Sequence, residues 1–209
     1  MTRKSIIERL AEKNTRTATD MCRPLQLERF SEDERFGRYC LRPPVGARFA
    51  SYTWVEVVVL RHGVIVHGDC DTVTFKGFYR NDSGPRGPLY WVGTHNYSYA
   101  EEKADHGRSG RSRDWDNEVC REEICLWRRE KTMEKDIARA LFDAAYDGQN
   151  QHEWLAEYWQ HGLDSEGASA GEVTPYPIFA AQAVLRRLLA ELEARDMRQS
   201  AREWFQRAA

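Results

Sequence analysis

Three side chains of metal-binding types alternate along one short segment of the chain, at His67, Asp69 and Asp71. Alternate residues of a regular strand share a face, with successive members of such a set about 6.6 Å apart. Gly68 permits a β-bulge that would bring the three side chains closer together. A metal site at these residues is therefore one hypothesis, but exposed carboxylates where a strand emerges are the commoner explanation. We predict no metal and no cofactor.

An Arg-His-Gly motif precedes this segment. The apolar run 57–60 followed by Arg61-His62-Gly63 is similar to the strand-end signature of the histidine phosphatase superfamily. The resemblance implies His62 as the nucleophile and Arg61 as a phosphate ligand. That family also needs a second His-Gly pair on a distant strand of a doubly wound sheet, and no parallel βαβ alternation surrounds the motif. We interpret Arg61-His62-Gly63 as the tight turn of a β-hairpin.

The Asp-x-Asp motif has a second resemblance. Asp69-Cys70-Asp71 resembles the first motif of haloacid-dehalogenase-type phosphatases, which implies Asp69 as the nucleophile and Asp71 as the acid and base. In that family the motif leads from a strand toward a helix. The β-branched and aromatic residues at 72–75 favour continuation as a strand instead. We therefore do not expect this phosphatase chemistry.

A metal-dependent nuclease or phosphodiesterase is the main enzyme alternative. An order of helix, three strands and helix permits a PD-(D/E)xK-type arrangement, in which Asp69, Asp71 or Asp82 supplies the first acid. Glu101 and Lys103 would supply the second acid and the lysine. Such a site needs both on a strand beside the first aspartate, so that metal and attacking water meet. Both lie in a polar segment that favours a helix, so we expect no catalytic residue; if the protein is an enzyme, the candidates are Asp69, Asp71, Glu101 and Lys103.

Four aromatic residues indicate a contact surface. Tyr90, Trp91, Tyr97 and Tyr99 are able to stack on bases or to anchor a protein interface. Aromatic side chains on a sheet are more often part of the core. Tyr97 and Tyr99 lie among polar residues, however, which favours their exposure. We predict these four residues as binding residues.

Three arginines lie in a Gly/Ser-rich loop at 106–113 and add a basic candidate. Arg108, Arg111 and Arg113 could neutralise phosphates, which would allow a nucleic-acid contact through this loop. The flanking acidic residues are typical of a solvated loop. We include the three arginines in the predicted binding surface.

Composition limits the class of partner. The chain has 209 residues, with 31 basic and 33 acidic side chains and a net charge of −2, so it has no overall attraction to nucleic acid and is not an acidic DNA mimic. Five scattered cysteines without a Cys-x-x-Cys pair favour reduced thiols in the cytoplasm. The N-terminus lacks the apolar core of a secretory signal, and no apolar run approaches the ~20 residues that cross a bilayer. We expect a cytoplasmic protein without membrane contacts.

The hydrophobic pattern predicts a single α+β domain over 1–209. Its sheet is antiparallel and three- to four-stranded, with a long central hairpin, and packs against several C-terminal helices. A boundary near residue 114, between a β-rich part (1–113) and a helical part (114–209), is the alternative. The expected elements are a helix at 3–13, irregular chain at 14–48, hairpin strands at 55–60 and 64–75, a third strand at 89–92, a helix at 97–104 and helices after 115, the clearest from Pro177.

The segment 68–104 carries a further resemblance. Its motifs, Gly68-Asp69-Cys70-Asp71, Tyr90-Trp91-Val92-Gly93 and the run from Tyr97 to Ala104, resemble small uncharacterised proteins of bacteriophages and prophages. The resemblance implies an accessory protein that binds and blocks a host component. We therefore expect a non-enzymatic inhibitor of a host or defence complex, similar in role to anti-CRISPR proteins. Its partner would be a host protein or ribonucleoprotein; a nucleic-acid-binding module is a further alternative.

Overall fold

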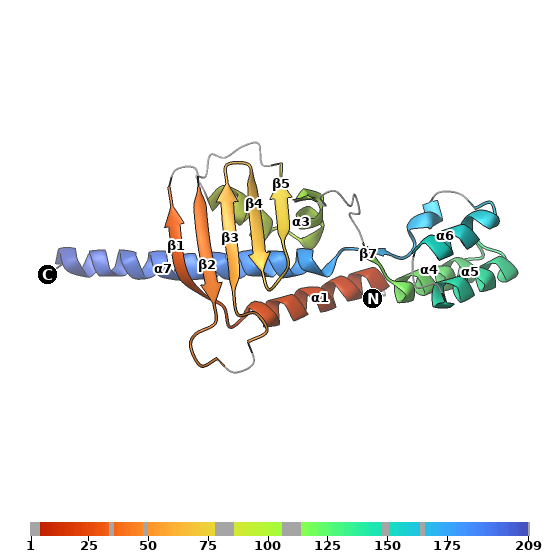
Figure 1. Ribbon diagram of the computed structural model, residues 1–209, viewed down its shortest axis with the longest axis horizontal. Coiled ribbons are helices and arrows are strands. Elements are labelled where there is room, and N and C mark those ends of the chain that lie inside the picture. Colours follow the sequence, from red (N-terminus) through yellow and green to blue (C-terminus); the bar gives the residue numbers. More distant parts are fainter. Residues whose placement is uncertain are drawn as a thin grey trace. The chain divides into compact units, whose positions relative to one another are not determined.

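The fold combines a six-stranded antiparallel sheet with several helices (Figure 1). The computed structural model describes residues 5–33, 36–47, 50–77, 86–105, 114–147, 151–163 and 166–208. Contacts within the chain define two compact units. We call Glu12–Gly110 with Tyr176–Ala209 the sheet unit, and Met1–Ala11 with Arg111–Pro175 the helical unit. Whether the chain folds as one domain stays a prediction.

Six strands form the sheet, and each pairs antiparallel with the next in chain order. The α+β class and the antiparallel sheet are confirmed, but three to four strands were too few. The two additional strands at the start of the sheet lie within 14–48, which we expected to be irregular. A register shift between Leu27 and Arg29 breaks the alternation of the first strand. The strands are β1 (Gln26–Glu32), β2 (Gly37–Arg42), β3 (Val55–Leu60), β4 (Gly63–Gly68), β5 (Val73–Lys76) and β6 (Ala104–Asp105).

The central hairpin is present, but its return strand is divided. β3 and β4 pair from Val55 to Leu60 across a two-residue turn at Arg61-His62, in agreement with the expected tight turn. The expected continuous strand over 64–75 is wrong, because the chain turns between β4 and β5. Gly68 has φ 128°, and a Cβ there would lie 2.5 Å from the Trp54 carbonyl oxygen. Only glycine fits this approach, so the break is specified by the sequence.

Helices α2 (Gly87–Thr94) and α3 (Tyr97–Lys103) follow the fifth strand. The expected strand at 89–92 is therefore wrong, since a short apolar run does not by its periodicity distinguish a strand from a buried helix. The helix at 97–104 is confirmed. Its N-cap is Asn96, whose side-chain oxygen accepts from Tyr99 N at 3.0 Å.

The core of the sheet unit lies between the strands and the helices α2, α3 and α7 (Tyr176–Ala208) (Figure 1). The helix expected from Pro177 is confirmed. Alternate strand residues point into this core and are fully buried. They include Val57, Val59, Val64, Val66 and Phe75. Among the described helices, none has both the length and the apolar character needed to cross a bilayer.

The helical unit packs three helices around aromatic side chains. Its buried cluster includes Trp154, Tyr158, Leu141 and Ile124. Its elements are β7 (Asp114–Trp115), α4 (Asn117–Arg129), α5 (Lys135–Asp147), α6 (Gln151–Gln160), a 3-10 helix (Glu166–Ser169) and β8 (Glu172–Val173), which pairs with β7.

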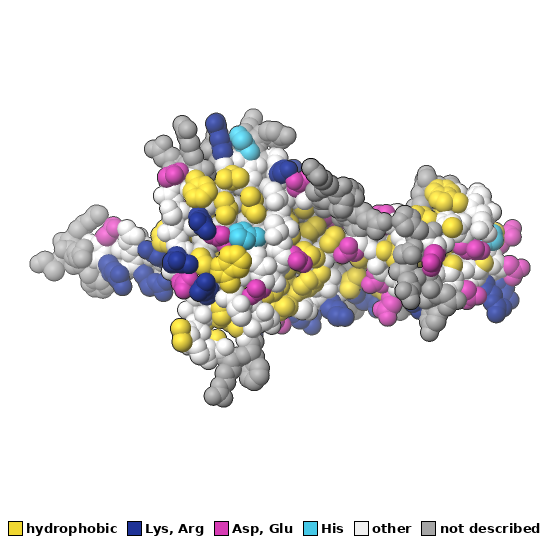
Figure 2. All heavy atoms as spheres, in the orientation of Figure 1, with side chains coloured by type: hydrophobic (Ala, Val, Ile, Leu, Met, Phe, Trp, Pro, Cys, Tyr) yellow, Lys and Arg dark blue, Asp and Glu magenta, His cyan; other side chains and the backbone are white. Residues whose placement is uncertain are grey.

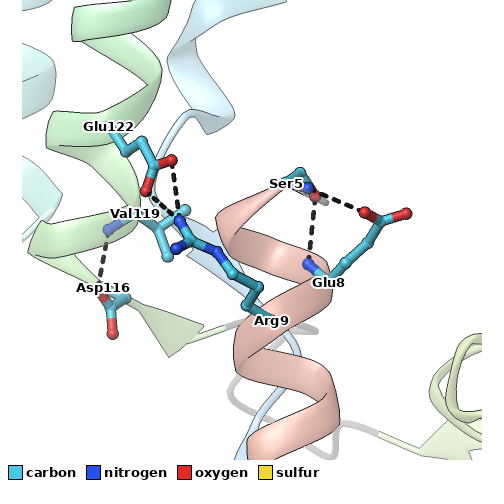
Figure 3. A network of polar contacts seen from close by, with 6 residues as sticks. All are labelled: Ser5, Glu8, Arg9, Asp116, Val119 and Glu122. Carbon is cyan, nitrogen blue, oxygen red and sulfur yellow. Dashed lines mark hydrogen bonds and ion pairs between the residues drawn. The ribbon is translucent and has the colours of Figure 1, made fainter. Parts of the chain in front are cut away.

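The helix α1 (Ile6–Cys22) begins in the helical unit and continues into the sheet unit. We expected it to end near residue 13. Ser5 and Glu8 form a capping box at its start, with reciprocal bonds of 2.9 and 3.2 Å (Figure 3). One turn later, Arg9 Nη2 donates to both carboxylate oxygens of Glu122 on α4, at 3.0 and 2.9 Å. These contacts attach the first turns of α1 to the helical unit.

Candidate functional site

A line of stacked aromatic rings runs along α2 and α3. We call it the aromatic ridge and define it as Tyr90, Trp91, His95, Tyr99 and Lys103. The ring centroids of Trp91 and His95 are 4.9 Å apart, and those of His95 and Tyr99 are 4.5 Å apart. Tyr90 meets Trp91 edge-on at 6.4 Å, and Lys103 Nζ lies 5.4 Å from the Tyr99 ring. Trp91 and His95 are four residues apart, and so are Tyr99 and Lys103, whereas the extended backbone at His95 and Asn96 separates the two helices.

The two largest side chains of the ridge face solvent. Tyr90 is 53 % exposed and Trp91 is 44 % exposed. Neighbouring residues of the same helix, Leu89 and Val92, are fully buried against the core. The helix therefore has one face that holds it in the fold and another that presents large rings outward.

Helix α7 supplies the hydrogen bonds that hold the ridge in place. The last carbonyl groups of a helix have no partner within it. Gln182 is buried, and its Nε2 donates to the carbonyl oxygens of Val92, His95 and Asn96 at 3.0, 2.9 and 3.2 Å. Arg186 adds bonds of 2.8 Å to the carbonyl oxygens of Gly93 and His95.

His95 stands between the two helices and is fixed by its own hydrogen bond. Its Nδ1 lies 2.8 Å from the Trp91 carbonyl oxygen. A carbonyl oxygen only accepts, so Nδ1 carries the proton. The imidazole is thus held between the rings of Trp91 and Tyr99, tilted by 37° and 31° to them, and the ridge is a preorganised surface.

The remaining predicted binding residues lie elsewhere. Tyr97 packs on Phe179 of α7, with ring centroids 5.4 Å apart, and is only partly exposed. It supports α3 from the core side instead of joining the ridge. Arg108, Arg111 and Arg113 lie outside the described residues.

A second surface lies on the sheet face opposite α2, α3 and α7, which we call the open face; Figure 2 views it from the front. Strand register places Arg29, Cys40, Glu56 and His67 in one row across β1 to β4. A groove of about 570 Å³ lies over this part of the sheet. Its lining includes Arg29, Arg38, Arg42, Cys40, Trp54 and Glu56.

A buried carboxylate organises this groove. Glu56 is only 7 % exposed and accepts hydrogen bonds from Arg38 Nε and, at 2.7 Å, from His67 Nε2. The Arg38 guanidinium, and then the His67 bond, hold the pKa of Glu56 below its usual value, so it is ionised at neutral pH. Trp54 meets the His67 ring edge-on, with centroids 5.0 Å apart.

The proposed metal ligands do not converge. His67 pairs with Glu56, whereas Asp69 accepts from Thr53 N, Thr53 Oγ1 and Trp54 N at 2.6, 2.7 and 3.1 Å. These bonds lower the pKa of Asp69 and hold the segment before β3. Asp71 is exposed in a left-handed turn with φ 70°. In the described part of the chain, no group of three His, Cys, Asp or Glu side chains is arranged to hold a metal ion.

The nuclease arrangement also lacks its required geometry. Glu101 and Lys103 lie on the helix α3 and not on a strand beside Asp69. Asp82 lies outside the described residues. Cys40 and His67 lie two strands apart, about 10 Å between their backbones. Each has another partner, since Cys40 Sγ lies 3.7 Å from Glu28 and His67 Nε2 pairs with Glu56 at 2.7 Å.

Most residues of the open face were not predicted from the sequence. Arg38, Cys40 and Arg42 alternate with the buried Tyr39 and Leu41, which is the period-two pattern of a half-buried strand. That signal was available within the segment we expected to be irregular. Searches of protein-family models, curated proteins and solved structures find no match to this chain. The functional argument therefore rests on the geometry of these two surfaces.

Proposed function

We propose that the protein is a non-enzymatic binding protein and that the aromatic ridge contacts a protein partner. The observation that carries this proposal is the exposure of Tyr90 and Trp91, 53 % and 44 %, on a helix whose other face is fully buried. Tyrosine and tryptophan are the side chains that most often dominate the binding energy of protein interfaces. Their positions here are set by the core and are not incidental to an open loop.

Preorganisation supports the same function. The bonds from Gln182 and Arg186 fix the end of α2, and the stacking with His95 fixes the ring of Trp91. Binding through such a surface loses little side-chain entropy, so more of the contact energy contributes to affinity. Lys103 Nζ lies over the Tyr99 ring and pairs with Glu102 Oε1 at 2.8 Å at one end of the ridge. A partner surface with apolar pockets would complement the ridge.

The partner class we propose is a host or defence protein complex in the cytoplasm of a bacterial host. Its support is the resemblance of residues 68–104 to phage and prophage proteins, because this segment contains the whole ridge. An inhibitor of this kind acts by occupying a surface and needs no catalytic group.

The test is affinity capture from a bacterial lysate with three immobilised proteins. These are the wild type, a double variant Tyr90→Ala and Trp91→Ala, and the control Trp159→Ala, which removes a tryptophan 50 % exposed on α6. We expect one protein or complex to be retained by the wild type and the control and lost from the double variant. Its purified form should then bind the wild type in a defined complex. Equal retention on all three proteins would contradict the proposal.

A further inference from the structure

The open face is a second candidate binding surface, distinct from the ridge. We propose that its groove binds a short stretch of single-stranded nucleic acid, with the phosphates on Arg29, Arg38 and Arg42 and a base on Trp54. Among the described residues, the charged side chains that line the groove are these three arginines and Glu56. Basic side chains therefore outnumber acidic ones in the groove, although the whole chain has a net charge of −2.

The arginine side chains extend into solvent. Arg29, Arg38 and Arg42 have side-chain exposures of 73, 62 and 47 %. Arg29 and Arg42 both lie 3.5 Å from Glu28, which is longer than a strong charge-assisted hydrogen bond. One carboxylate shared by two guanidinium groups leaves positive charge and free donors for phosphate oxygens.

The spacing of the arginines matches an extended strand. Arg38 and Arg42 lie four residues apart on β2, about 14 Å along the strand, and Arg29 is on the neighbouring β1. A few nucleotides of a stretched single strand cover this distance. A double helix would instead need a convex element that enters one of its grooves, whereas this face is a sheet with a shallow groove.

Aromatic rings at the edge of the groove provide a stacking platform. Trp54 is partly exposed and is held by the edge-on contact with His67, whose side chain is 31 % exposed. Figure 2 shows apolar side chains, a histidine and several basic side chains together on this face. A positively charged groove beside aromatic rings is the general design of surfaces that bind single strands without sequence preference.

Glu56 has a positioning role in this site. Its carboxylate holds Arg38 and His67 on either side, so the guanidinium and the ring beneath Trp54 keep fixed places. The carboxylate is buried, and its two oxygens are already paired with Arg38 and His67. It therefore orders the binding groups at little cost in repulsion.

The experiment measures fluorescence anisotropy of labelled oligo(dT) and oligo(U) of about 12 nucleotides with the full chain. If three arginines contact phosphates, a plot of the logarithm of the association constant against the logarithm of the salt concentration should have a slope of about −2, because each contact contributes about −0.7. Affinity should fall about 20-fold between about 50 and 200 mM salt. No binding at low salt, or binding without salt dependence, would overturn the proposal.

The double variant Arg29→Ala and Arg42→Ala tests the site itself. Its slope should shrink to about −0.7, so that the same salt change costs only about threefold. The matched control, Arg128→Ala and Arg139→Ala, removes two exposed arginines of the helical unit and should keep the wild-type slope. An unchanged slope in the first variant would overturn the assignment. If that variant fails to fold, Arg29→Lys and Arg42→Lys, which retain the charge, must retain the slope.

Three further measurements test the stacking residue, the class of ligand and the location of the site. Trp54→Leu should weaken binding about tenfold at every salt concentration without changing the slope, because stacking carries no charge. Displacement by oligoglutamate or by free phosphate as effectively as by oligonucleotide would overturn a nucleic-acid site. The ridge variant Tyr90→Ala and Trp91→Ala should bind oligonucleotide normally. Its loss of oligonucleotide binding would move the site to the ridge.

Discussion

Aromatic rings stack in series in both units, inside the core of one and along the surface of the other. In the helical unit, Trp115, Trp154 and Tyr158 follow one another at 5.2 and 4.9 Å, and the last two are buried. In the sheet unit, Trp91, His95 and Tyr99 stack at similar distances, but the series ends in solvent at Tyr90.

The difference shows what aromatic composition alone leaves open. The same ring contacts stabilise a core when other apolar groups surround them and form a recognition surface when they do not. In α2 the apolar residues Leu89 and Val92 already occupy the core side, so Tyr90 and Trp91 have to point outward. Exposure is thus a consequence of helical spacing and not of disorder.

The largest expected loss of stability is at Trp154, in the buried aromatic series of the helical unit. Trp154→Ala should lower the free energy of unfolding by about 3–5 kcal/mol, since it empties the centre of the helical unit. Denaturant unfolding followed by circular dichroism measures this change. The neighbour Trp159, which is half exposed, provides the control, and its alanine variant should lose less than about 1 kcal/mol. Equal losses in the two variants would erase the distinction between core and surface rings.

A smaller loss of stability is expected at Gln182, the side chain of α7 that bonds to the end of α2. Gln182→Leu retains the approximate volume of the side chain but leaves three carbonyl groups at the end of α2 without its amide donor. The cost should be about 1–3 kcal/mol, together with faster amide hydrogen exchange in α3. The same substitution at the exposed Gln199 should be close to neutral. A neutral Gln182→Leu would show that the ridge does not depend on α7.

Acid should lower the stability of the sheet unit, because Glu32 becomes protonated. Hydrogen bonding from Arg86, at 2.7 and 2.9 Å, is the main cause that lowers the pKa of Glu32. The folded state then binds fewer protons than the unfolded state. This stabilisation is complete above the unfolded pKa of about 4.3 and is lost as the pH falls below it. Thermal unfolding of Glu32→Gln should therefore depend less on pH below about 4.3 than that of the wild type.

The smallest expected effect on stability is at the ridge. The double variant Tyr90→Ala and Trp91→Ala should change the free energy of unfolding by less than about 1 kcal/mol, because neither side chain is buried. Denaturant unfolding again provides the measurement. A loss comparable to that of Trp154→Ala would mean that these rings belong to the core and that their exposure has no functional meaning.

The elements whose hydrophobic periodicity is uninterrupted were predicted correctly from the sequence. The β3–β4 hairpin has β-branched residues on both strands and a two-residue turn, and α7 keeps a long apolar stripe from Ile178 to Leu192. Both features depend on local patterns that a single sequence contains. The class of fold was therefore accessible without the structure.

The elements and site residues that were not predicted depend on contacts between residues far apart in the sequence. β1 is an edge strand with a register shift, so its alternation is obscured, and α2 is helical because Leu89 and Val92 pack against α7. The site shows the same limit. Tyr90, Trp91 and Tyr99 were identified by residue type, but His95 was missed because a single histidine has no pattern of its own. The row of Arg29, Glu56 and His67 exists only through strand register.

The measurement that tests the central claim most directly is the dissociation constant of the purified protein with the partner isolated by capture. Titration calorimetry should compare the wild type, Trp91→Ala and the control Trp159→Ala. We expect Trp91→Ala to weaken binding about 30-fold or more, as the loss of a dominant interface residue does, with the control unchanged. If Trp91→Ala and the wild type bind equally well, the aromatic ridge is not the contact surface.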